Sequence, residues 1–225
     1  MIMDYSKQMN LIVPDVDCNK RINIIGTGAG GSWLAFFLLR MGFKNIHAYD
    51  FDDIEEHNVP NQLFPESHIG KPKVESLKEV YEYFHDDGDM PRLHVHNQKI
   101  TEDNAHTLTG IVFCEVDTMK DRKMLYELCY KYGQTELWIE GRLGLYGSYI
   151  YTLAKNGKDY KAKYEETFYA DEEAEVSSCG VSQTALPSAV NKATLELMQM
   201  IMWLKGESYY NMIQYAIPHM VVFTE

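Results

Sequence analysis

The sequence predicts an α/β fold: a doubly wound, mostly parallel Rossmann-like sheet with additional antiparallel strands in the C-terminal half. Short apolar runs at 22–25, 46–49 and 111–114 alternate with stretches of helical spacing. That alternation is typical of parallel strands joined by helices. Farther along, the runs 137–140 and 144–153 follow each other closely, which indicates an antiparallel hairpin.

A glycine-rich turn, 26–32, joins the first strand to a helical pattern at 33–41. Glycine lets a backbone turn sharply and approach a phosphate, since no Cβ is in the way. The free N–H groups at the start of the helix then face an anion. Asp50 ends the next strand, where a carboxylate accepts a ribose hydroxyl in nucleotide-binding folds. The candidate phosphate-binding residues are Gly26, Gly28, Gly30 and Gly31.

The remaining chain is interpreted as one domain, 21–225, preceded by an N-terminal arm, 1–20. Helical spacing or an apolar run predicts further helices at 70–84, 119–132 and 185–204 and further strands at 93–96 and 220–223. An acidic stretch at about 160–180 lacks apolar periodicity and is expected to be a long crossover loop, with or without a helix fragment.

Composition excludes several classes of protein. No apolar run approaches the about 20 residues of a membrane span, and the N-terminus lacks a secretory signal. The net charge of −12 makes nucleic acid an unexpected partner. The four cysteines form no Cys-x-x-Cys pair, which favours a cytoplasmic protein without zinc: Cys18, Cys114, Cys129 and Cys179. Cys114 and Cys129 are expected to be buried.

Amide, carboxylate and ammonium groups follow the second strand. A nicotinamide dehydrogenase has no need of a lysine there, whereas the charge of a triphosphate must be neutralised. This set of side chains therefore favours ATP over NAD. Its members are Asp52, Asn58, Asn61, Gln62 and Lys73.

At this point the sequence resembles the ThiF/MoeB/HesA superfamily, the adenylating fold shared with ubiquitin-activating enzymes. The resemblance covers roughly residues 5–120, through the glycine turn, an Asp-x-Asp pair, an Asn-x-x-Arg-Gln motif, a Gly-x-x-Lys motif and a later aspartate. The matching residues are 26–32, Asp50, Asp52, Asn58, Gln62, Gly70, Lys73 and Asp117. The second half, with 140–142, 164–167 and 171–174, is similar to compact members found in phages and mobile elements.

The resemblance implies an ATP-dependent adenylyltransferase and a homodimer. Its substrate would be a carboxylate, such as the C-terminus of a ubiquitin-like protein or a peptide. Lys73 would neutralise phosphate charge, and Asp117 would hold magnesium, which prefers oxygen ligands. Asp117 also precedes a predicted helix and is a candidate for its N-cap; the two roles are compatible.

Three departures from the family pattern concern catalysis. Asn61 replaces the arginine of Asn-x-x-Arg-Gln, and Arg142 is a candidate to compensate for it. The two zinc-binding Cys-x-x-Cys pairs common in the family are missing. Lys7 replaces an arginine that, in the family, crosses the dimer to the partner's ATP, and lysine cannot make a planar fork.

Cys179 has two interpretations. It precedes a predicted helix, whose N-terminus lowers a thiol pKa, so it is a candidate to attack an acyl-adenylate or to carry sulfur. It is equally interpreted as a small loop residue that packs. Alternatives for the whole chain are adenylation of a small carboxylate or a modified tRNA base, a nucleotide-binding scaffold without turnover, and an NAD-linked oxidoreductase.

Overall fold

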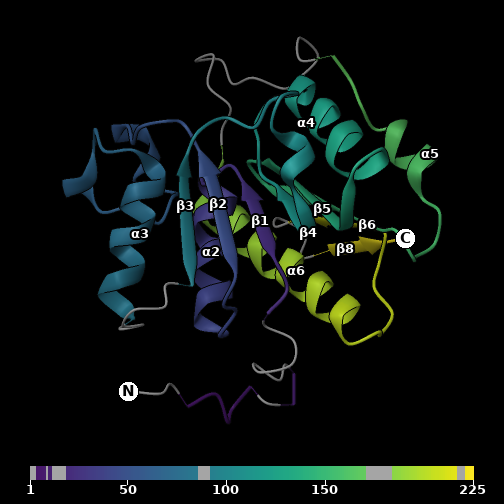
Figure 1. Cartoon of the computed structure of the whole chain (residues 1–225), viewed down its shortest axis with the longest axis horizontal. Coiled ribbons are helices and arrows are strands. Elements are labelled where there is room, and N and C mark those ends of the chain that lie inside the picture. The colour runs from purple at the N-terminus through teal and green to yellow at the C-terminus, as the bar shows by residue number, and fades with distance from the viewer. Residues whose placement is uncertain (1–3, 9, 12–18, 86–91, 171–183, 217–220) are drawn as a thin grey trace.

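The computed structural model describes residues 4–8, 10–11, 19–85, 92–170, 184–216 and 221–225 (Figure 1). Within these ranges, one 8-stranded sheet has the order β3-β2-β1-β4-β5-β6-β7-β8. The strands are β1 (Ile22–Ile25), β2 (Ile46–Asp50), β3 (Leu93–Asn97), β4 (Thr109–Cys114), β5 (Gln134–Gly144), β6 (Gly147–Ala154), β7 (Met212–Ala216) and β8 (Val221–Thr224).

Strands β1 to β5 pair in parallel, and β5 to β8 pair as antiparallel neighbours. The predicted fold class is therefore confirmed. Strand β5 is longer than the apolar run at 137–140 indicated, because it pairs with β4 on one side and with β6 on the other. Strand β7 was not predicted: its sequence, MIQYA, is short and has mixed polarity.

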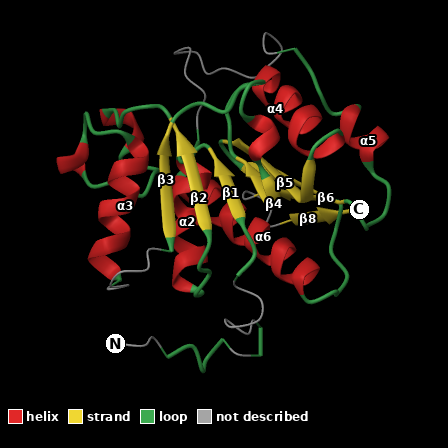
Figure 2. Cartoon of the chain, viewed as in Figure 1, coloured by secondary structure: helices red, strands yellow, loops and turns green. Residues whose placement is uncertain are grey.

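Helices cover both faces of the sheet (Figure 2). Helices α2 (Ala29–Arg40), α3 (Lys73–Phe84) and α6 (Leu186–Leu204) pack on one face through residues such as Leu38, Leu77 and Ile201. The other face carries α4 (Met119–Leu125), the π-helix η4 (Tyr126–Lys131) and α5 (Lys161–Glu165), packed through aromatic residues. Short 3₁₀ turns complete the set: η1 (Glu56–Asn58), η2 (Glu66–His68) and η3 (Ala105–Thr107).

Two cysteines lie in the core, as expected. Cys114 and Cys129 are free and buried, and burial raises the pKa of the Cys129 thiol to about 12. Of the helices that the structure describes, none combines the length and the apolar character needed to cross a membrane.

The sheet order creates a switch point between β1 and β4, the two central parallel strands. The chain leaves β1 toward β2 on one side, whereas β4 leads toward β5 on the other. Ligands of open α/β sheets bind beyond the carboxyl ends of the strands at such a point.

Candidate active site

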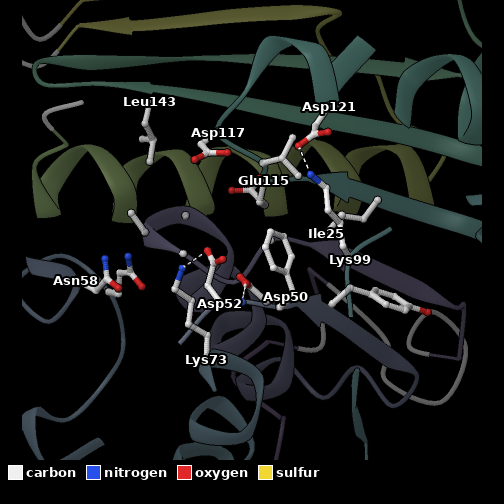
Figure 3. Close-up of a pocket in the computed structure, with 18 of the residues that line it drawn as sticks. Ile25, Asp50, Asp52, Asn58, Lys73, Lys99, Glu115, Asp117, Asp121 and Leu143 are labelled. Atoms are coloured by element: carbon white, nitrogen blue, oxygen red, sulfur yellow. Dashed lines mark hydrogen bonds and ion pairs between the residues drawn. The ribbon is translucent and has the colours of Figure 1, made fainter. Parts of the chain in front are cut away.

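A cavity of about 710 Å³ lies at this switch point, beyond the carboxyl ends of β1, β2 and β4 (Figure 3). Nine of the predicted site residues line it: Gly26, Gly28, Gly30, Asp50, Asp52, Asn58, Gln62, Lys73 and Asp117. Because these residues come from five separate segments of the chain, the fold itself assembles them.

The glycine turn lines the cavity. Gly26 has φ +97°, and a Cβ there would stand 2.7 Å from the carbonyl oxygen of Glu115, so the turn requires glycine. Gly28 is the N-cap of α2, where no side chain caps the helix and no acid lies in the first turn. The N–H groups at the start of α2 are therefore available to an anion.

Gly30 lets two charged side chains approach the backbone of α2 closely. A Cβ at this position would overlap the Glu115 carboxylate and the Lys192 ammonium, which lie against the first turn of α2. Gly31 is buried against the carbonyl of Gly26 and does not line the cavity. Its contribution is to close the turn rather than to contact a ligand.

Asp50 is held in a fixed orientation at the end of β2. Its Oδ2 accepts hydrogen bonds from the Thr27 N–H at 2.6 Å and the Thr27 hydroxyl at 3.0 Å. Its Oδ1 accepts from the Asp52 N–H at 3.0 Å. The carboxylate thus ties the glycine turn to β2, and Asp50 also lines the cavity.

Lys73 enters the cavity from the first turn of α3. Its Nζ lies 2.8 Å from Asp52 Oδ2, and its side chain is 10% exposed whereas that of Asp52 is 50% exposed. The Lys73 N–H also donates to the Asp52 carbonyl at 2.9 Å. Because its partner is half exposed to solvent, the Lys73 ammonium can exchange Asp52 for another anion that enters the cavity.

The amide side chains have different surroundings. Gln62 lines the cavity, and its Oε1 is buried without a hydrogen-bond partner among the described residues. Asn58 lines it as well, with its Oδ1 accepting from the Glu55 N–H. Asn61 does not line it: its Nδ2 donates to Thr184 Oγ1 at 2.6 Å. Asn61 thereby ties its turn to Thr184, two residues before α6.

Asp117 lies beyond β4 and is exposed to the cavity. It does not cap α4. The N-cap is Thr118, whose hydroxyl accepts a hydrogen bond from the Asp121 N–H at 3.1 Å. The alternative interpretation of Asp117 as the cap is therefore wrong, and its carboxylate is left available to a ligand.

Arg142 is held away from the cavity. It contacts Glu140, at 2.5 Å, and the Thr167 carbonyl and hydroxyl, at 2.8 and 2.9 Å. It is absent from the cavity lining, which includes Arg122 instead. Burial opposes the charge of Arg122, but Glu140, 3.1 Å away, raises its pKa. Compensation by Arg142 for Asn61 thus remains a prediction that this placement does not favour.

One predicted residue, Lys7, lies away from the cavity. Lys7 is exposed in the described stretch 4–8, which runs near the amino ends of the strands (Figure 1), whereas the cavity lies beyond their carboxyl ends. The same segment is anchored there by Tyr5, whose hydroxyl accepts from Arg92 at 2.8 Å just before β3. Cys179 lies outside the described residues.

The sequence interpretation missed seven charged residues of the cavity: Asp53, Glu55, Lys99, Glu115, Asp121, Arg122 and Lys192. Lys99 and Asp121 pair at 2.8 Å across one side of it. Lys192 pairs with Glu115 and, at 2.9 Å, with Glu196. One signal was present: Lys192 and Glu196 stand four residues apart as the two charged residues of a helix that is mostly apolar, and charges are rarely buried unless paired.

Comparison with known proteins bears on the family and the fold of the chain. The model of the ThiF family matches residues 6–224 of the chain. The ubiquitin-like modifier-activating enzyme 5 of Drosophila persimilis is 31% identical over 97 residues, which cover 41% of this chain and 24% of that enzyme. The chain spans only 24% to 31% of the length of the curated relatives it matches.

Solved structures share the fold. E. coli MccB superposes with a TM-score of 0.77 at 16% identity, covering 99% of this chain and 69% of MccB. MccB solved together with AMPCPP and MccA gives a TM-score of 0.73 at 16% identity, covering 94% of this chain and 65% of that one. At such identities the likeness concerns the fold alone.

Proposed function

The chain belongs to the ThiF family, and we propose that it is an ATP-dependent adenylyltransferase that activates a peptide-type carboxylate. The observation that carries the proposal is one cavity lined by an uncapped helix N-terminus, by Asp50 and by Lys73. This set provides phosphate donors, a ribose acceptor and a neutralising charge side by side.

The size and the charge of the cavity support ATP with magnesium as its ligand. Its volume of about 710 Å³ is within the range of small-molecule sites, about 300–1,000 Å³. Its lining includes seven carboxylates but only four lysine and arginine side chains. A triphosphate without a bound cation would therefore be repelled. The described part of the chain holds no cluster of three or more metal-binding side chains. Magnesium, however, is commonly held by one or two carboxylates and substrate phosphates, which Asp117 suits.

The proposed reaction is attack by a substrate carboxylate on the α-phosphate of ATP, with pyrophosphate leaving. The product is an acyl-adenylate. No general base is required, because a C-terminal carboxyl has a pKa of about 3.5 and is ionised at neutral pH. The chain supplies position and charge: N–H groups from Gly28 onward hold phosphates, Asp50 holds the ribose, and Lys73 neutralises developing charge. Magnesium held by Asp117 would add further charge neutralisation.

The relatives suggest the kind of substrate. One group activates ubiquitin-like modifiers, and MccB has been solved with MccA. We therefore place a ubiquitin-like protein or a peptide first, and a small carboxylate or a modified tRNA base second. We also propose a homodimer located in the cytoplasm. The alternative is a scaffold that binds nucleotide without turnover. Such a protein would show no pyrophosphate exchange.

Two measurements test the proposal. Isothermal titration calorimetry with magnesium should show binding of ATP in preference to NAD. Exchange of labelled pyrophosphate into ATP, with peptides and small carboxylates as candidate substrates, should then detect the adenylation step. Tight NAD binding without ATP binding would overturn the assignment, while ATP binding without exchange for any candidate would favour the scaffold.

A further inference from the structure

The cavity has two sides, separated by the glycine turn. Asp50, Asp52 and Lys73 lie on the side of β2 and α3, whereas Glu115 and Asp117 lie beyond β4 (Figure 3). The second side is completed by residues of β5, α6 and the segment before α6: Gly141, Leu143, Thr184 and Lys192. With the ribose at Asp50 and the phosphates on the turn, the part of this second side around Glu115 remains for the acyl group.

Glu115 is the buried acid of the second side. Its side chain is 2% exposed, and one oxygen, Oε2, is bound by Lys192. The other oxygen, Oε1, has no hydrogen-bond partner within the described ranges, although the residue lines the cavity. A buried acceptor without a partner is destabilising, more so when it is charged, so a ligand donor at this place is strongly favoured.

The orientation of Glu115 is fixed by Lys192, which Glu196 holds in place. Lys192 Nζ also donates to both oxygens of Glu196, at 2.9 and 3.0 Å. Burial opposes the charge of Lys192, but Glu115 and Glu196 raise its pKa, so it stays an ammonium. Gly30 and Gly141 allow this group to fit, since a Cβ at either would overlap it. The carboxylate therefore cannot turn Oε1 toward the ammonium without giving up an existing contact.

We infer that Glu115 selects the acyl substrate by accepting a hydrogen bond from an N–H group on the carbon next to the activated carboxylate. The substrate class is then a peptide whose C-terminal residue offers its amide N–H, rather than a simple fatty acid or an ester. This inference rests on the proposed adenylation. Sites built to bind a substrate N–H reject analogues without it, because their own polar group is then left unpaired.

The test uses two matched mimics of the acyl-adenylate on the full chain. The first is 5′-O-[N-(acetylglycyl)sulfamoyl]adenosine, which has the amide N–H; the second is the acetoxyacetyl analogue, in which an ester oxygen replaces that N–H. Calorimetry should show the amide mimic binding about 10- to 100-fold more tightly, the range of a hydrogen bond to a charged group. Equal affinities of the two mimics would overturn the inference.

Glu115→Gln sharpens the test while keeping the size of the side chain. Lys192 attracts the amide oxygen, so the NH₂ group of the glutamine faces the cavity and opposes the ligand N–H. The preference for the amide mimic should disappear, whereas Glu136→Gln, on a surface glutamate paired with Lys20, should retain it. A preference that survives Glu115→Gln contradicts the inference.

The outcomes separate the inference from the proposed function. If ATP and both mimics fail to bind to the wild-type chain, the nucleotide site has been misread. If ATP binds but the two mimics do not differ, only the role of Glu115 is wrong. If circular dichroism shows that Glu115→Gln does not fold, the comparison of the two mimics on the wild-type chain still tests the role of Glu115.

Discussion

Lys73 has the environment of a residue that exchanges one anion for another. It is nearly buried and paired with a half-exposed carboxylate. Lys73→Ala should therefore lower pyrophosphate exchange by about 10- to 100-fold or more, since a charge-assisted contact contributes about 1.5–3 kcal/mol. Exchange kinetics at saturating substrate would measure the loss.

A matched control lies two residues earlier. Lys71 is exposed, pairs with Glu79 at 2.7 Å and does not line the cavity. Lys71→Ala should keep exchange close to that of the wild type, because exposed ion pairs contribute little. If Lys73→Ala behaves like Lys71→Ala, the motif has been misinterpreted.

Asp117 and Thr118 should separate activity from stability. Asp117→Ala should abolish exchange and leave the melting temperature nearly unchanged, because the residue is exposed and does not cap α4. Thr118→Ala should destabilise the fold by about 1 kcal/mol, the usual effect of losing an N-cap. Parallel thermal melts and exchange assays would measure both; full exchange in Asp117→Ala would rule out its role with magnesium.

At the residue scale, local spacing predicted only part of the cavity. The glycines, Asp50 and Lys73 were found because they stand at strand or helix ends, where short motifs carry meaning. Glu115 and Lys192 were missed because they are 77 positions apart. Only the folded sheet brings β4 and α6 together, and no single segment contains that information.

Among the elements, β2 and β3 carry a stack of histidine rings on the face of the sheet that also bears Tyr49. The rings of His47 and His94 are 4.7 Å apart, and His47 Nδ1 lies 3.0 Å from His96 Nε2. Burial and, next, Arg21 lower the pKa of His47 to about 4. Burial likewise lowers the pKa of His96.

This stack predicts a loss of stability in mild acid. An unfolded chain protonates histidine below about pH 6.5, whereas folded His47 stays neutral down to about pH 4. Between these values the unfolded state binds more protons, so the free energy of unfolding should fall as the pH falls. The melting temperature should drop from pH 7 to pH 5, and by less in His47→Gln. An identical drop in the variant would contradict this cause.

Periodicity predicted elements well where they are long and strongly apolar. Helix α6, predicted at 185–204, begins and ends almost as expected. The helix expected at 119–132 divides into α4 and the π-helix η4, a change of geometry that periodicity does not resolve. Strand β7 was not predicted, because it is defined by its pairing with β6 and β8 rather than by its own composition.

At the scale of the whole molecule, the cavity lies beyond the carboxyl ends of the parallel strands, whereas the described residues 4–8 run near their amino ends (Figure 1). Lys7 is thus badly placed to serve the cavity of its own chain. If it contacts ATP at all, the ATP must belong to a second copy. Light scattering at micromolar concentration should therefore give about twice the 26.0 kDa of the chain. A 26.0 kDa species would remove the proposed role of Lys7.

Adenylation and attack by a thiol are two separate chemical steps. Adenylation needs no thiol, because the substrate carboxylate is already an ionised nucleophile. Among the described cysteines, Cys114 and Cys129 are buried, and burial raises the pKa of both thiols, so neither is suited to attack an acyl-adenylate. A thioester formed after pyrophosphate has left would then involve Cys179, the cysteine that the family resemblance singles out.

Cys179→Ser should accordingly leave pyrophosphate exchange largely intact and remove any thiol-sensitive adduct with the substrate. Cys129→Ala is the matched control and should keep that adduct, because its thiol is buried in the core. Intact-mass spectrometry beside the exchange assay, with one substrate throughout, distinguishes the outcomes. Loss of exchange in Cys179→Ser would assign the cysteine to the nucleotide site or to the fold. If neither readout changes, the reaction on this chain ends at the adenylate, which a second nucleophile must then accept.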